Sequence, residues 1–89
     1  MKIIRGAIAG TLESGDVLVT MEPCLDGLQI SIESVVKKQF GQAIEDSVKD
    51  VLSAHGVEAA HVLLNDRGAV DCVIQARVEA AVLRASEVM

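Results

Sequence analysis

The chain has 89 residues, of which 51% are hydrophobic and 24% are charged, and its formal net charge is -5. This composition excludes a disordered polypeptide, and the length predicts a single domain over residues 1–89 that is too small to enclose a deep active-site cleft. The acidic balance and the single aromatic residue exclude a nucleic-acid groove, so we expect proteins as partners.

The first two predicted strands are joined by a short polar connection. Residues 7–12 and 17–21 are small or β-branched apolar runs, and Pro23 bounds the second run. Between them, Ser14-Gly15 is typical of a two-residue turn, in which glycine supplies the positive φ. The pattern predicts a hairpin with the hydroxyl of Ser14 facing water at its tip.

A third predicted strand has the clearest alternation of apolar and polar residues. Leu28, Ile30 and Ile32 fall on one face, as in a half-buried strand. The loop before it, with a turn at Asp26-Gly27, is expected to separate two antiparallel strands.

After Ser34 the apolar residues recur every three or four positions, which is the spacing of an amphipathic helix. Ser34 is a candidate N-cap, and Gly56 is a candidate for the residue after the helix ends. Phe40 and Ile44 are the leading core candidates. We therefore expect Phe40→Ala to damage the fold more than any surface change.

Residues 57–64 indicate a fourth strand, residues 65–68 a turn, and a second helix is expected to begin near Asp71 and to run to Ser86. The best apolar face of that helix consists of Val70, Ile74, Val78, Ala81, Val82 and Ala85. The order β-β-β-α-β-α predicts an α+β fold, with a small antiparallel or mixed four-stranded sheet and two helices on one face.

Little chemistry is predicted outside the hairpin. His55 and His61 have no cysteine or carboxylate at a zinc-ligand spacing, so no metal site is expected, and no Ser-His-Asp order suggests a catalytic triad. Arg67 and Arg77 could bind a phosphate, but we interpret them as ordinary surface charges. We therefore assign no catalytic residue.

The chain is predicted to be cytoplasmic. No apolar run reaches the ~18 residues of a membrane span, and the first residues lack the pattern of a secretory signal. In a reducing compartment, two distant thiols are typical of small buried side chains. We expect Cys24 and Cys72 to be unpaired and buried.

Four segments of the sequence together point to a known family. Residues 9–17, 34–41, 65–72 and 76–80 closely resemble, in order and approximate spacing, the acyl carrier (gamma) subunit of bacterial citrate lyase. The resemblance runs over nearly the whole chain. It implies that Ser14 is joined by a phosphodiester to 2'-(5''-triphosphoribosyl)-3'-dephospho-coenzyme A.

The resemblance also implies partners. In that family the thiol of the prosthetic group carries an acetyl group, which an alpha subunit exchanges for citrate. A beta subunit then cleaves the citryl thioester to oxaloacetate and the acetylated carrier. A dedicated transferase installs the prosthetic group, and the carrier itself catalyses no step.

The neighbours of Ser14 in the Glu13-Ser14-Gly15-Asp16 motif carry negative charge. We hypothesise that Glu13 and Asp16 contact basic groups on the transferase or on the lyase subunits and orient the tip of the hairpin. The alternative is that both are solvated acids in a turn.

Three other functions remain open from the sequence. The acyl carrier of malonate decarboxylase uses the same kind of prosthetic group on a serine, although its local motif matches less well. A small ligand-binding regulatory module and an unmodified interaction subunit are compatible with the same fold.

Overall fold

The computed structural model describes residues 1–86, apart from the side chains of Lys37 and Lys38. The elements in chain order are β1 (Ala7–Ala9), β2 (Val17–Glu22), β3 (Leu28–Ser34), α1 (Lys37–Ala54), β4 (Ala60–Asp66) and α2 (Asp71–Ala85). This order confirms the predicted β-β-β-α-β-α fold. Positions 87–89 of the predicted domain lie outside the described residues.

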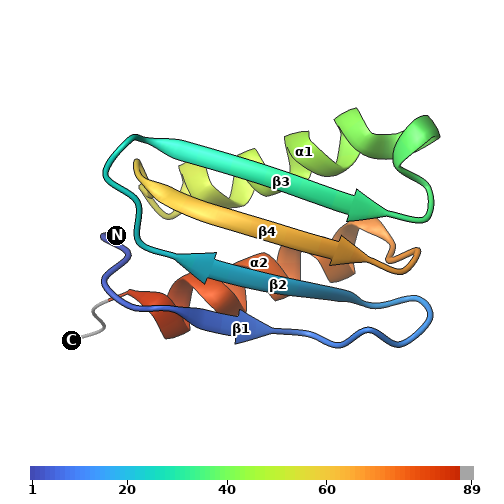
Figure 1. Ribbon diagram of the computed structural model, residues 1–89, viewed down its shortest axis with the longest axis horizontal. Helices are drawn as coiled ribbons and strands as arrows, with labels where there is room; N and C mark the ends of the chain where they lie inside the picture. Colours follow the sequence, from blue (N-terminus) through green and yellow to red (C-terminus); the bar gives the residue numbers. More distant parts are fainter. Residues whose placement is uncertain (87–89) are drawn as a thin grey trace.

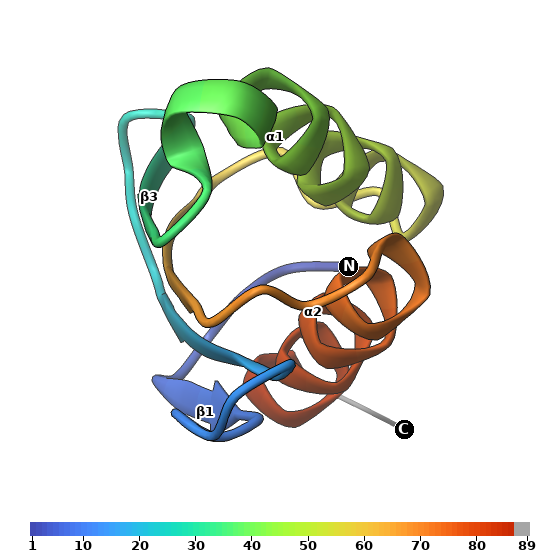
Figure 2. The ribbon, with the colours of Figure 1, turned by 90° about the vertical axis from the view of Figure 1, so that its right-hand side faces the viewer.

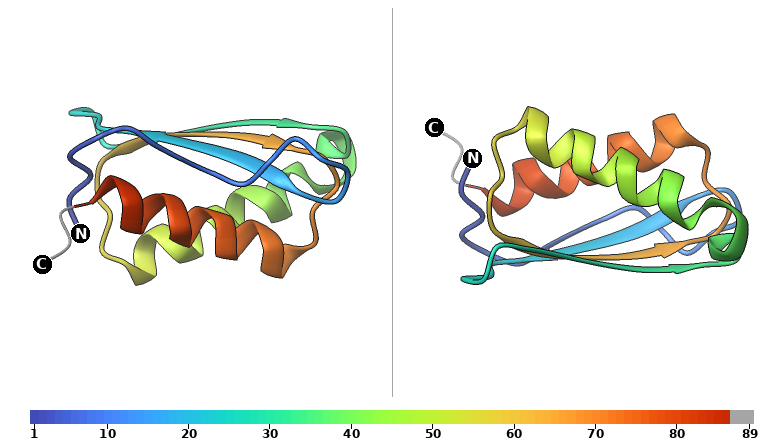
Figure 3. Two further views of the ribbon diagram at one scale, coloured as in Figure 1. Left: turned by 90° about the horizontal axis from the view of Figure 1, so that it is seen from below. Right: turned by 90° about the horizontal axis from the view of Figure 1, so that it is seen from above.

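The sheet is mixed. Its strand order is β1-β2-β4-β3, with β1 and β4 antiparallel to β2, and β3 parallel to β4. Both helices pack on one face of the sheet, and the other face is open (Figures 1 and 3). The predicted α+β architecture, with both helices on one face, is confirmed.

The core lies between the sheet and the two helices. The inner strands β2 and β4 alternate, so that every second side chain points toward the helices and is buried. Each fully buried Val or Leu contributes about 1.5–3 kcal/mol. The largest fully buried apolar side chains of the whole core, from strands and helices together, are Met21, Leu52, Leu64, Val17, Val19, Val48, Val62, Val78 and Val82.

The connection between β1 and β2 is longer than predicted. β1 ends at Ala9, because Gly10 adopts a φ of 93° and leaves the extended conformation that a strand needs. Residues 10–16 therefore form the connection, so the predicted strand over residues 7–12 is wrong beyond Ala9 and the connection is longer than two residues, but Ser14 and Gly15 do form its turn, as predicted.

Two further strand predictions need correction. The loop after β2 does separate strands that run in opposite directions, but β4 lies between β2 and β3 and pairs with both. β4 spans Ala60–Asp66 rather than residues 57–64. Val57 instead lies buried in the connection, where its amide donates to the Leu52 carbonyl at 2.9 Å.

The start of α1 also differs from the prediction. The N-cap is Val36, whereas Ser34 ends β3, donates its hydroxyl to Asp66 at 2.7 Å and accepts from the Val36 amide at 3.1 Å. Phe40 is 54% exposed and is not a core residue, while Ile44 is buried as predicted.

The other helix boundaries agree with the sequence. His55 is the C-cap of α1, so Gly56 occupies the predicted position after the helix. α2 begins at Asp71 and buries the predicted face except for Val70, which precedes the helix and is exposed.

The cysteines are unpaired, as predicted, but Cys24 is only half-buried and Cys72 is exposed. Neither helix in the described part of the chain is long and apolar enough to cross a membrane.

Candidate functional site

Ser14 stands at the apex of the connection between β1 and β2. The register pairs Ala7 with Met21 and Ala9 with Val19, so the two residues of each pair lie the same number of positions before and after residue 14. The Asp16 amide donates to the Glu13 carbonyl at 3.0 Å, which closes a turn containing Ser14 and Gly15. Gly15 has the predicted positive φ, at 83°, and Ser14 is exposed. The connection therefore presents Ser14 to solvent, as the sequence predicts.

A second connection holds one side of this turn. The Gly15 amide donates to the Arg67 carbonyl at 2.7 Å, and the Arg67 amide donates to the Asp16 carbonyl at 2.9 Å. These bonds continue the pairing of β2 with β4 beyond the strand ends. Both connections lie at the same end of the molecule (Figures 1 and 2).

The carboxylate of Asp16 is bound inside the chain. Arg77 on α2 donates from Nε to Oδ1 at 3.0 Å and from Nη2 to Oδ2 at 2.9 Å. The Thr11 hydroxyl donates to Oδ2 at 2.8 Å, and the Val17 amide donates to Oδ1 at 2.7 Å. The hydrogen bonds from Arg77 and then from Thr11 lower the pKa of Asp16 to about 2. Asp16 is thus ionised and fastens the connection to α2.

This ion pair revises two interpretations of the sequence. Arg77 is not an ordinary surface charge, because it forms a bidentate pair with Asp16. Asp16 is not merely a solvated acid, and Arg77 already satisfies its carboxylate without a partner protein. The side chain of Glu13 is exposed, so the hypothesis of a contact with a partner now rests on Glu13.

The hydroxyl of Ser14 is unengaged in the part of the chain that the structure describes. The hydrogen bonds of the connection use backbone groups and the side chains of Thr11 and Asp16. A serine without a neighbouring base is a weak nucleophile at neutral pH. An enzyme that modifies Ser14 must therefore bring its own base.

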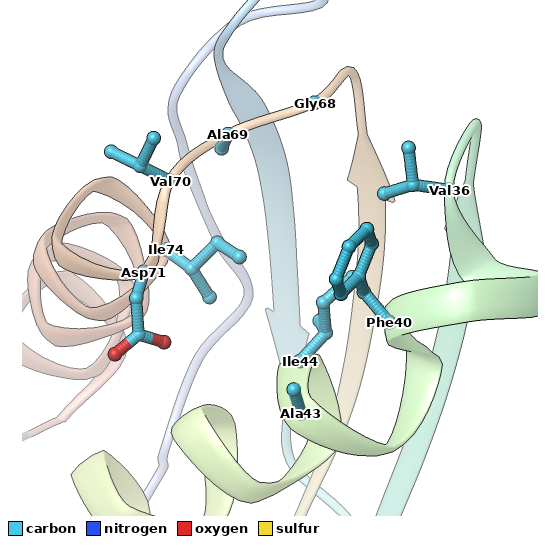
Figure 4. A pocket seen from close by; sticks show the side chains of 9 residues that line it. All are labelled: Val36, Phe40, Ala43, Ile44, Gly68, Ala69, Val70, Asp71 and Ile74. Atoms are coloured by element: carbon cyan, nitrogen blue, oxygen red, sulfur yellow. The ribbon is translucent and has the colours of Figure 1, made fainter.

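An apolar groove of about 400 Å³ opens beside the connection that holds the turn. Ile74 of α2 points across the groove toward Phe40 and Ile44 of α1 (Figure 4). The connection between β4 and α2, residues 68–70, completes the wall. The sequence does not reveal this groove, because the spacing of Phe40 fits the buried face of α1. The signal available was that Phe40 is the only aromatic residue in the chain.

The remaining candidate residues lie elsewhere. His55 ends α1 at the opposite end of the molecule from the Ser14 turn, with its Nε2 3.5 Å from the Glu79 carboxylate. His61 lies in β4, paired with Gln29 of β3. Residues 1–86 contain no group of three His, Cys, Asp or Glu side chains that could hold a metal ion.

The chain is similar to known proteins over nearly its whole length. The model of the family described as malonate decarboxylase delta subunit (MdcD) matches residues 4–85. The chain is 53% identical over 88 residues to the citrate lyase acyl carrier protein of Escherichia fergusonii, which covers 98% of this chain and 91% of that protein. It is 54% identical over 89 residues to the citrate lyase acyl carrier protein of Haemophilus influenzae, which covers 100% of this chain and 93% of that protein.

A solved structure shows a similar fold. It is the crystal structure of a Pseudomonas malonate decarboxylase hetero-tetramer in complex with malonate, and one of its chains superposes with a TM-score of 0.68 at 22% identity. The match covers 94% of this chain and 87% of that chain.

Proposed function

Since this chain belongs to the citrate lyase acyl carrier protein family, we propose that Ser14 is the residue to which its prosthetic group is attached. An acyl carrier is a non-catalytic subunit that presents a covalently held acyl group to enzymes. What it needs is one reachable attachment atom on a stable scaffold. The exposed hydroxyl of Ser14, at the apex of a braced turn, is the observation that carries this proposal.

The surroundings of Ser14 fit a bulky substituent. A Cβ built on Gly15 meets no heavy atom within 4 Å, so the space beside the serine is open. The turn is nevertheless held in place, because Asp16 and Gly15 bind Arg77 and Arg67. The proposed group is 2'-(5''-triphosphoribosyl)-3'-dephospho-coenzyme A, joined through a phosphodiester.

In the proposed role, the attached group, Ser14 and the ion pair beside it each have a distinct function. The group supplies a terminal thiol on which acetyl and citryl thioesters form. On a prosthetic-group transferase, the Ser14 oxygen attacks the phosphorus next to the ribose in the triphosphate of the donor, diphosphate leaves, and the transferase provides the base that takes the serine proton. Asp16 and Arg77 keep the turn in one orientation for the transferase and for the alpha and beta subunits of citrate lyase. Tethering confines the acyl group to the complex and raises its effective concentration at both active sites.

The intact mass of the protein purified from its native host tests the attachment residue. We expect an adduct with the mass of the proposed group less the diphosphate that leaves when the phosphodiester forms, and we expect Ser14→Ala to remove it completely. Ser53→Ala, at an exposed serine of α1, is the matched control and should keep the adduct. An adduct that persists in Ser14→Ala would place the attachment elsewhere.

A second candidate is the carrier of a malonate decarboxylase, which the name of the family model and the similar fold favour. Reconstitution separates the two functions. The loaded chain should restore citrate cleavage to citrate lyase that lacks its carrier. Restored malonate decarboxylation, with no citrate cleavage, would support the second candidate.

A further inference from the structure

We propose that the groove between α1 and the start of α2 holds the adenine base of the group carried on Ser14. The inference rests on the proposed function and adds a resting position for the group on the carrier itself. It concerns how this chain's own residues hold the part of the group that lies between the attachment point and the thiol.

The connection between β4 and α2 contacts the Ser14 turn and also lines the groove. Arg67 accepts from the Gly15 amide and donates to Asp16, so it lies directly against the turn that presents Ser14. The next three residues, 68–70, form one wall of the groove. The Ser14 turn and the connection between β4 and α2 lie at one end of the molecule (Figures 1 and 2), and this connection supplies a wall of the groove. In the proposed group, a phosphate and two riboses separate Ser14 from the adenine, and the thiol lies farther out.

The side chains that line the groove suit a flat aromatic ring. Phe40, the only aromatic side chain, remains 54% exposed at the groove, and Val70 on the opposite wall is 63% exposed. Bases stack on exposed aromatic rings, and the volume of about 400 Å³ lies within the usual range of roughly 300–1,000 Å³ for small-molecule pockets. The Phe40 ring and the facing Ile74 offer an apolar slot for a flat ring (Figure 4).

Charge favours the base over the other parts of the group. Among the side chains that the structure describes, the one charged group lining the groove is that of Asp71, whose carboxylate accepts from the Ser47 hydroxyl. A carboxylate at the rim repels phosphates, whereas a neutral base meets no such penalty. The diphosphate and the pantetheine are therefore left in solvent, so that the thiol stays free to reach an enzyme.

Nuclear magnetic resonance of the loaded full chain tests the proposal, with intact mass confirming the adduct on Ser14. We expect nuclear Overhauser effects from the adenine protons to Phe40 and Ile74, and shifted amide resonances over residues 68–71. Phe40→Ala should reduce the docked fraction about fivefold or more, in line with the usual strength of base stacking. Phe40→Leu, which keeps an apolar side chain without a ring, should also reduce it.

The matched control is Leu63→Ala, at an exposed apolar residue on the open face of the sheet, which should leave the effects unchanged. A chain with the adduct on Ser14 whose groove resonances equal those of the unloaded chain would overturn this inference and leave the proposed function intact. A chain with no adduct on Ser14 would overturn both. Groove shifts that appear only with added lyase subunits, or that grow with the concentration of unloaded chain, would assign the groove to a partner or to a second copy.

Discussion

At the scale of single residues, Asp16 does more for the site than its place beside Ser14 suggests. Its two carboxylate oxygens accept from Arg77, Thr11 and the Val17 amide, which come from three separate parts of the chain. An ionised carboxylate with several donors is held firmly, since charge-assisted hydrogen bonds are short and strong. Asp16 thereby fixes the orientation of the turn that presents Ser14.

We expect Asp16→Asn to lower the free energy of unfolding at pH 7 by about 1–3 kcal/mol. The amide cannot form the charged pair with Arg77, and hydrogen bonds to charged groups contribute about 1.5–3 kcal/mol, less where the partner is exposed. Urea unfolding measures the loss. Glu13→Gln, at the exposed acid of the same turn, is the control and should change stability by less than about 0.5 kcal/mol.

The effect of Asp16→Asn depends on pH in a defined direction. The folded-state pKa of Asp16 is about 2, below its ordinary value of 3.8, so its stabilisation is complete above pH 3.8. The stabilisation is lost as the pH falls from 3.8 toward 2, because over that interval the unfolded state binds a proton that the folded state does not yet bind. The unfolding curves of the wild type and of the variant should converge over that interval. An equal difference at pH 7 and at pH 2 would show that the charge is not responsible.

At the scale of elements, the connection between β1 and β2 owes its shape to two glycines in different surroundings. Gly10 has a φ of 93°, and a Cβ there would stand 1.8 Å from the Val17 carbonyl oxygen. Gly15 has a φ of 83°, but a Cβ there would meet open space. A side chain at position 10 is disfavoured both by the positive φ and by a clash with Val17. A side chain at position 15 is disfavoured by the positive φ alone.

This difference predicts unequal costs for the same substitution. Gly15→Ala should cost about 1–2 kcal/mol, the usual penalty of a left-handed conformation for a residue with a side chain. Gly10→Ala should cost clearly more, because the backbone of Val17 must also move. Thermal unfolding of the two variants makes the comparison, and equal losses would contradict the close approach of the Val17 carbonyl to Gly10.

The same connection shows what the sequence predicts and what it does not. Local patterns indicate two strands with Ser14 between them, and the positive φ of Gly15 follows from its place in the turn. The ion pair of Asp16 with Arg77 joins residues far apart in the sequence, so no local pattern reveals it. The pairing of β4 with both β2 and β3 also joins residues far apart in the sequence, so no local pattern reveals it.

Phe40 shows that helical periodicity alone does not establish that a side chain is buried. Its spacing from Ile44 is that of a buried stripe, and a helix-period pattern cannot tell whether the sheet extends beneath every turn. Phe40 instead faces the groove beside α2, and its ring stays 54% exposed. The wrong prediction for the core thus falls on a residue of the candidate binding surface, as is common where function competes with packing.

At the scale of the whole molecule, one layer of helices and one sheet share a single core, and the deepest side chains decide stability. We expect Leu52→Ala to cost about 2–5 kcal/mol, because Leu52 of α1 is fully buried in the hydrophobic core. Phe40→Ala should cost clearly less, contrary to the expectation from sequence. Urea unfolding of both variants is the measurement, and a larger loss for Phe40→Ala would mean that its ring is packed rather than open.

The order of synthesis gives the brace of the Ser14 turn a further meaning. The turn belongs to the first fifth of the chain, but the groups that hold it, the backbone of Arg67 and the guanidinium of Arg77, belong to the last third. A nascent chain therefore displays the serine long before it can hold the serine still. The finished shape of this turn is a sign that translation has passed α2, and any enzyme that recognises that shape distinguishes a completed carrier from a fragment.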